Sequence, residues 1–153
     1  MLRTLMIGAV SAAAIALSPT TFAQQGQFGS GAEARAMVER AIVELKANEG
    51  AAIEKFNNGE AGFRDRDLYL FCFKMNDGKT VAHVLPTQIG MDVRTIKDTT
   101  GKAFGLELYN GANENLITEV SHMFPRPGSD VPAQKVSYVT RVGNLACGVG
   151  FYK

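Results

Sequence analysis

The sequence contains no tryptophan, only two cysteines and two histidines, and almost no excess of charge of either sign. The cysteines and histidines are too few and too scattered for a closed zinc site, which usually takes four ligands in close pairs. No CxxC or CxxCH motif is present, which excludes the common redox and haem-attachment signatures. Sixteen Lys plus Arg against fifteen Asp plus Glu leave a net charge of +1, too little for a broad field that attracts nucleic acid. We therefore expect no metal, no cofactor and no nucleic-acid partner.

The chain also has no hydrophobic run long enough to cross a bilayer. Its longest run, residues 5–17, is about 13 residues, whereas a membrane helix needs roughly 20. Arg3 precedes this run, and the small residues Thr21 and Ala23 stand where a signal peptidase reads. We expect a signal peptide over 1–23, cleaved after Ala23, and a mature chain that is periplasmic or secreted and not inserted in a membrane. The alternative is a permanent membrane anchor.

Export changes the interpretation of the two cysteines. In an oxidising compartment Cys72 and Cys147 are expected to form a disulfide, which requires their strands to be neighbours. Such a bond closes a long loop and is worth about 4 kcal/mol in the chain-entropy model. The alternatives are two buried thiols and, less readily, a catalytic nucleophile.

One long amphipathic helix is predicted at the start of the mature domain, which we place at 30–153. Residues 24–29 are polar and contain glycine, so we expect a flexible tail there. Ser30 and Glu33 fit a capping box, and apolar residues then recur at helical spacing up to a stop at Gly59. Gly50 inside this span marks a kink or a break.

The remainder of the domain contains five predicted strands joined by short links. Both faces of the first strand are apolar, which is typical of a central strand. Turn signals at Gly78 and Gly143 predict two hairpins, and the short links exclude a parallel sheet. The fold class is therefore α+β, with helices packed on an antiparallel sheet. The strands are expected at 67–74, 79–84, 117–124, 134–142 and 145–152, with a wandering segment over 85–101 and a short helix from Phe104 to about Asn113.

The last predicted strand carries two glycines on one face. Gly148 and Gly150 alternate with Cys147, Val149 and Phe151, so one side of this strand is bare backbone. Bare backbone admits a closely packed neighbour, either the long helix or a ligand. We expect the helix on the glycine side.

Several segments of the mature chain match one family in order and spacing. They are DLYLFCF at 67–73 with the turn at Gly78, VAH at 81–83, IGMD at 89–92, KD and GK at 97–98 and 101–102, FPRPG at 124–128, KVSYV at 135–139 and CGVGFYK at 147–153. Through them the sequence, from about Ala34 onward, resembles the single Cache domains with which bacteria sense small molecules outside the cell. The resemblance implies a PAS-like fold: a five-stranded antiparallel sheet, its first strand beside its last, with a long N-terminal helix behind and a pocket in front.

Two features depart from the family pattern. Val84 follows His83 where the family usually has proline, and the chain ends at Lys153 where family receptors continue into membrane helices and signalling modules. The resemblance therefore implies a stand-alone exported sensor domain that captures a small organic acid or amino acid without a catalytic step. It further implies that the loaded domain is presented to a membrane sensor kinase or chemoreceptor. The alternative is a periplasmic accessory interaction module that keeps the fold and binds no small ligand.

Four polar side chains lie on or beside the implied pocket. Arg126 is expected to grip a ligand carboxylate with two hydrogen bonds, and Lys135 supplies a second positive charge. Tyr138 and His83 are further ligand-binding candidates, with His122 a weaker one. Each has a structural alternative: a solvated loop charge, an exposed strand charge, or a packed ring with its polar atom satisfied.

The remaining candidates are three aromatic residues and an acid. Tyr69, Phe71 and Phe73 share one face of the first strand and are expected to form a wall of the pocket, although core packing explains the same pattern. Asp98 either caps a helix start or accepts a hydrogen bond from a ligand ammonium.

Overall fold

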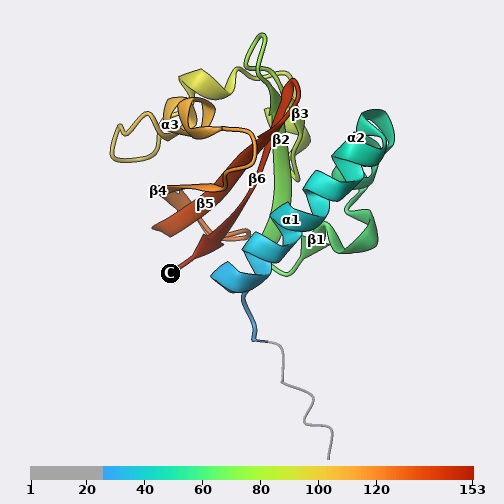
Figure 1. Cartoon of the computed structure of the whole chain (residues 1–153). Helices are drawn as coiled ribbons and strands as arrows, with labels where there is room; N and C mark the ends of the chain where they lie inside the picture. The colour runs from blue at the N-terminus through green and yellow to red at the C-terminus, as the bar shows by residue number, and fades with distance from the viewer. Residues whose placement is uncertain (1–25) are drawn as a thin grey trace, which may run out of the picture.

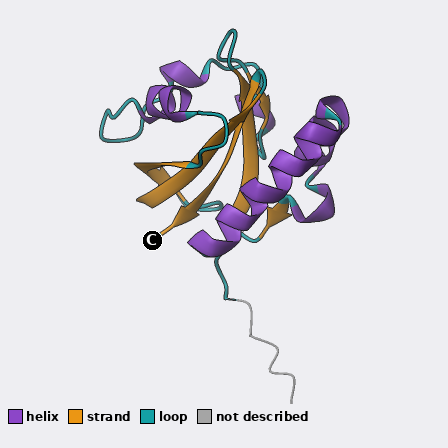
Figure 2. Ribbon diagram, in the orientation of Figure 1, coloured by secondary structure: helices purple, strands orange, loops and turns teal. Residues whose placement is uncertain are grey.

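The computed structural model describes residues 26–153, so the predicted signal peptide and its cleavage site lie outside the described part. Two helices lie across one face of an antiparallel sheet, and a third lies on the other side (Figure 1). Figure 2 shows the loops gathered at the ends of the strands. Between residues 26 and 153 no helix is both long and apolar enough to cross a membrane.

The predicted long helix is two helices, α1 (Gly31–Ala47) and α2 (Glu49–Asn58). The capping box is confirmed: Ser30 Oγ accepts from the Glu33 amide, and the Glu33 carboxylate accepts from the Ser30 amide. The break falls at Asn48 rather than at Gly50. The reason is that the Asn48 side chain accepts a backbone N–H of the following turn and so caps the start of α2.

The sheet has the predicted antiparallel strands and one more. The two-residue strand β1 is additional to the five expected and pairs with β2. The order is β1-β2-β6-β5-β4, with β3 also paired to β2, so the first long strand lies beside the last as the resemblance implies. The strands are β1 (Arg64–Asp65), β2 (Leu68–Lys74), β3 (Thr80–Ala82), β4 (Thr118–Pro125), β5 (Pro132–Val142) and β6 (Leu145–Tyr152).

The connection from β3 to β4 holds the remaining helices. It contains two short 3-10 turns, η2 (Pro86–Gln88) and η3 (Val93–Thr95), and the helix α3 (Phe104–Gly111). A third such turn, η1 (Glu60–Gly62), joins α2 to β1. The short helix is thus confirmed, and the irregular segment expected over 85–101 contains the two 3-10 turns η2 and η3.

The disulfide is confirmed. Cys72 of β2 and Cys147 of β6 are direct partners across the two strands, and their sulfur atoms are 2.06 Å apart. Both side chains are buried in the core beneath α1 and α2. The bond therefore joins the middle of the sheet on its helix-covered side.

Two apolar cores lie on opposite faces of the sheet. The face that packs against α1 and α2, here called the helix face, is mainly aliphatic and includes Leu70, Cys147 and Val149. The opposite face, here called the cavity face, carries an aromatic core that includes Phe73, Phe104 and the apolar residues of η3, α3 and β4 around them.

The two glycines of β6 lie on the cavity face, so the expectation that the helix packs against them is wrong. A Cβ at Gly148 would lie 2.6 Å from Cζ of Phe71, and one at Gly150 would lie 2.2 Å from Cε of Lys135. The bare backbone is thus covered by two side chains of the cavity face. Cys147, before the first glycine, and Val149, between the two, pack against the helices instead.

The described part of the expected flexible tail is bound to the domain. The Gly29 amide donates to Oδ1 of Asp67 at 2.7 Å, and Nη1 of Arg66 donates to the carbonyls of Gly26 and Phe28 at 3.0 Å each. Residues 26–29 therefore lie along the start of β2 instead of extending away from it.

Candidate functional site

A cavity of about 60 Å³ lies between the cavity face of the sheet, the η3 segment and α3. Most of its wall is aromatic or aliphatic, with one lysine and two histidines among the side chains. The lining residues are Tyr69, Phe71, Phe73, Thr80, His83, Gln88, Val93, Ile96, Phe104, Leu108, His122, Phe124, Lys135 and Ser137. The three aromatic residues expected to wall the pocket, Tyr69, Phe71 and Phe73, all line it.

Lys135 places a buried ammonium group at this cavity. The residue is only 3% exposed, and its Nζ donates to the hydroxyl of Tyr69 at 3.1 Å. The same nitrogen lies 4.5, 4.8 and 5.4 Å from the ring centroids of Tyr69, Tyr152 and Phe124. Within residues 26–153 Lys135 forms no ion pair with a carboxylate. Aromatic faces and one neutral hydroxyl thus replace the acidic partner that a buried lysine usually has.

The electrostatic consequence is a less stable charge on Lys135. Burial lowers the pKa of Lys135 to about 8, although the negative charge of Asp67 opposes the shift. An ammonium has three N–H donors, and the Tyr69 hydroxyl accepts one of them. The hydroxyl proton of Tyr69 has no acceptor among the described residues. The cavity therefore presents a positive charge and unused donors at one point.

Gly150 explains why the lysine can lie flat on the sheet. Lys135 is on β5, beside β6, and its side chain crosses the backbone of Gly150. Any side chain at this position would meet Cε and Cδ of Lys135 within 3.1 Å. The absence of a Cβ at Gly150 thus positions the ammonium at the cavity.

The two histidines are neutral walls of the same cavity. Nδ1 of His83 accepts from the Leu85 amide at 2.9 Å, and the ring of His122 stacks on Phe104 with centroids 4.1 Å apart. Burial, reinforced by the charge of Lys135, lowers the pKa of both His83 and His122 to about 4. Among the described residues of the lining, Lys135 is therefore the one charged side chain at neutral pH. In the described part of the chain no three His, Cys, Asp or Glu side chains gather as metal ligands.

Arg126, predicted to hold a ligand carboxylate, does not line the cavity. Its Nη1 donates to Oδ2 of Asp67 at 3.2 Å, and its guanidinium carbon lies 4.2 and 4.5 Å from the rings of Phe28 and Tyr152. It borders a neighbouring groove and not the cavity. Because Asp67 is only 6% exposed, Arg126 is already used to neutralise a buried acid of the protein.

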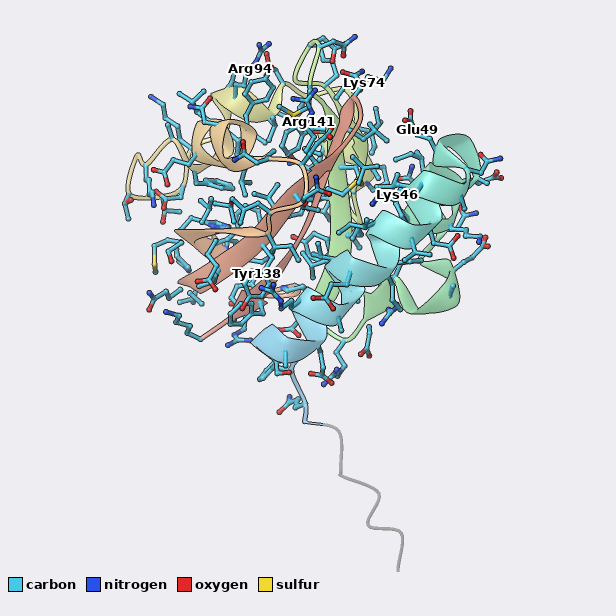
Figure 3. The ribbon with its side chains drawn as sticks, in the orientation of Figure 1. Lys46, Glu49, Lys74, Arg94, Tyr138 and Arg141 are labelled. Atoms are coloured by element: carbon cyan, nitrogen blue, oxygen red, sulfur yellow. A yellow bond between two sulfur atoms is a disulfide. The ribbon has the colours of Figure 1, made fainter. Side chains whose placement is uncertain are left out.

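Tyr138 and Asp98 also lie away from the cavity. Tyr138 is on the helix face, stacked on Phe151 at 5.4 Å with Arg35 above it, and Figure 3 shows it beside the start of α1. Asp98 holds a turn and does not cap a helix start, since the N-cap residue of α3 is Ala103. Its carboxylate accepts from the Thr100 hydroxyl and, at 2.9 Å, from the Met123 amide of β4, and these bonds lower its pKa.

Sequence reasoning missed the wall opposite the sheet. Val93, Ile96, Phe104 and Leu108 come from the segment between β3 and β4, whose apolar residues follow no single period. Gly105 brings this wall together, since a Cβ there would lie 1.9 Å from the carbonyl oxygen of Val93. His122 shares its face of β4 with Phe124, and that alternation is the signal that identifies it as a lining residue.

Three solved structures that share this architecture come from chemotaxis or chemosensory proteins. A methyl-accepting chemotaxis protein from Vibrio parahaemolyticus is 19% identical, with a TM-score of 0.63 over 79% of this chain and 86% of that one. The periplasmic sensor domain of a chemotaxis protein is 25% identical, with a TM-score of 0.58 over 78% and 87%. A Cache chemosensory domain, described for its recognition of carboxylic acids, is 21% identical, with a TM-score of 0.56 over 78% and 85%.

Two further comparisons concern sequence. A search of curated proteins finds no match to this chain. The family model of single Cache domain 2, in contrast, matches residues 18–152. The antiparallel sheet with helices on both sides and the sensor-domain neighbours agree with that match, and the chain belongs to the single Cache domain 2 family.

Proposed function

We propose that this Cache sensor domain binds a small monocarboxylate in the cavity, with Lys135 and Tyr69 as its hydrogen-bond donors. The observation that carries the proposal is the buried ammonium of Lys135, which among residues 26–153 has a single neutral hydrogen-bond partner and no paired acid. A ligand carboxylate supplies the missing negative charge and accepts the unused protons of both groups. Charge-assisted hydrogen bonds of this kind are strong in an apolar site.

The charges of the lining favour a monocarboxylate over an amino acid or a diacid. No Asp or Glu is among the lining residues, so a ligand ammonium would lose its hydration without gaining a partner. A second ligand carboxylate would face aromatic rings and the neutral imidazoles of His83 and His122. Of the two ligand classes that the sequence suggests, the organic acid is therefore the one we propose.

The size of the cavity favours a short acid. Its 60 Å³ compare with about 300 Å³ or more for drug-sized ligand sites. The remaining wall is apolar and suits a short alkyl chain. The carboxylic-acid-recognising Cache domain among the structural neighbours supports the same ligand class.

Signalling by this domain is proposed to pass through a partner. We place the mature chain in the periplasm or outside the cell after cleavage at Ala23, and the proposed partner is a membrane sensor kinase or chemoreceptor. Ligand can change such a complex only if the partner's affinity for the loaded domain differs from its affinity for the empty one. Binding of the purified partner ectodomain, measured with and without saturating acid, tests this step.

The ligand is tested by thermal unfolding and calorimetry of the mature chain with straight-chain monocarboxylates, dicarboxylates and amino acids. A monocarboxylate at 100 times its Kd should add about 2.7 kcal/mol and raise Tm by several degrees. Lys135→Met should abolish the shift. Lys74→Met, the same change at an exposed lysine of β2, is the matched control and should preserve it. A flat response to every compound would contradict the proposal and favour the accessory interaction module.

A further inference from the structure

We infer that Phe71 limits the chain length of the bound acid, because its ring lies on the bare backbone of Gly148 and closes the cavity along β6. The inference rests on the proposed function, since it concerns the ligand held by Lys135. Phe71 is thereby a specificity-determining residue rather than a further donor.

The position of the ring follows from the strand register. Phe71 of β2 and Gly148 of β6 are direct cross-strand partners, and both lie on the cavity face. A Cβ at Gly148 would lie 2.6 Å from Cζ and 3.1 Å from Cε2 of Phe71. The ring is thus folded across the neighbouring strand, into space that any other residue at position 148 would occupy.

Lys135 lies on the same face of β6 as Phe71, a short distance further along the strand. Lys135 crosses Gly150 and Phe71 crosses Gly148, two residues apart on one face of β6. Residues i and i+2 of a strand are about 7 Å apart. An acid whose carboxylate meets Lys135 and whose chain runs along β6 therefore reaches the Phe71 ring after a few carbon atoms.

The other aromatic walls are less suited to this role. Phe73 and Phe104 belong to the buried core of the cavity face, where truncation disturbs the packing of α3. Tyr69 and Phe124 pack on the ammonium of Lys135. Phe71 is only partly buried and packs at the edge of this core, so it can be shortened while the core and the donors stay in place.

The experiment measures Kd for acetate, propionate, butyrate, pentanoate and hexanoate with the mature wild-type chain, Phe71→Leu and Phe71→Ala. Wild type should bind the acids of up to about four carbons best, because longer chains meet the ring. Phe71→Ala should bind hexanoate better relative to propionate by about 15-fold or more, on the basis of about fourfold for each methylene buried. Phe71→Leu should shift the ratio in the same direction by less.

Phe63→Leu is the matched control. Phe63 is a fully buried phenylalanine of the helix-face core, so the substitution costs at least as much packing as Phe71→Leu, on the side of the sheet away from the cavity. Its Kd ratios should equal those of wild type. If wild type binds the short acids and the Phe71 variants keep its length profile, the inference is overturned while the proposed function stands. If wild type and both Phe71 variants bind none of the acids, both are overturned.

Discussion

The helix face and the cavity face of one sheet are built from alternate residues of the same strands, yet they bury opposite kinds of groups. On β6, Cys147 and Val149 point into an aliphatic core closed by the disulfide. Gly148 and Gly150 point the other way and leave room for Phe71 and Lys135. The period of two in a strand thus separates the two environments residue by residue.

The two faces differ in their contribution to stability: the helix face stabilises the fold, and the cavity face contains groups that lower its stability. The helix face is tied covalently by the disulfide, whereas the cavity face contains a cavity and a buried ammonium that pairs with no acid among residues 26–153. Voids and unpaired buried charges both lower stability, and they persist in binding sites because a ligand fills and neutralises them. Substitutions on the helix face should therefore change stability, and those on the cavity face should change binding.

The largest effect should come from removing the disulfide. Cys72→Ser with Cys147→Ser opens a loop with a sequence separation of 75 residues, which should lower the free energy of unfolding by about 4 kcal/mol. Urea unfolding measures this loss. Kd for the short acid should stay within twofold of wild type under conditions where the variant is folded. Loss of binding by a fully folded variant would show that the two faces are not independent.

Arg126→Ala should have the next largest effect. Asp67, nearly buried, would keep only the Gly29 amide as a partner, and the two rings that enclose the guanidinium would lose their contact. We expect the free energy of unfolding to fall by about 2 kcal/mol, less than for a fully buried pair because the Arg126 side chain is 26% exposed. Arg64→Ala, a change at an exposed arginine of β1 with no ion pair in the described part, is the control.

The Arg126 variant also separates the two interpretations of this arginine. An arginine that holds the ligand would lose acid-induced stabilisation and keep the melting temperature of the empty protein. The contacts with Asp67 and Tyr152 predict the reverse: a lower melting temperature with acid binding retained. Calorimetry of the folded variant decides between them.

Acid binding should weaken as pH rises through the pKa of Lys135. In the proposed complex the carboxylate binds the ammonium form, and the pKa of Lys135 is about 8 in the empty domain. From pH 7 to pH 9 the charged fraction falls by about tenfold, and Kd should rise by that factor as long as the bound lysine stays protonated. The pKa of His83 and of His122 is about 4, so both stay neutral over this range. Calorimetry at constant ionic strength measures the change, and a flat profile would exclude the ammonium as the main ligand group.

The sequence predicts the frame of the fold well because its signals are local. Alternation in β2, the turn at Gly143 and the capping box at Ser30 depend on neighbouring residues, and all three are confirmed. The disulfide is predicted from the expected export of the chain together with its two cysteines. The break at Asn48 is harder to place because a good cap competes there with the glycine two residues later.

The site is predicted less well because it depends on contacts distant in sequence. Lys135, His83 and the aromatic face of β2 meet at the cavity. Arg126 instead forms an ion pair with Asp67, which is 59 residues away in the sequence. The alternation that places Tyr138 with Val136 does not say which face of the sheet carries the cavity. Gly148 and Gly150 indicate which face carries the cavity, but only when the side chains of their cross-strand neighbours are known.

The smallest effect, and the one that tests the comparison of faces most directly, is the stability of the empty Lys135→Met variant. Burial lowers the pKa of Lys135 from its ordinary value of 10.5 to about 8, so the unfolded chain binds a proton more tightly than the folded one. Wild-type stability should therefore rise between pH 8 and pH 10.5 as the folded lysine is neutralised, and this rise should be missing from the variant.

At pH 7 Lys135→Met should be more stable than wild type by about 1 kcal/mol, since a methionine of similar shape avoids burying the charge. The lost contacts to three aromatic rings and to the Tyr69 hydroxyl keep the gain small. Urea unfolding of both proteins across this pH range, with Lys74→Met as the control, measures the difference. A variant less stable than wild type at pH 7 would mean that the aromatic rings around Lys135 stabilise the empty fold, so that the cavity face contributes to stability as the helix face does.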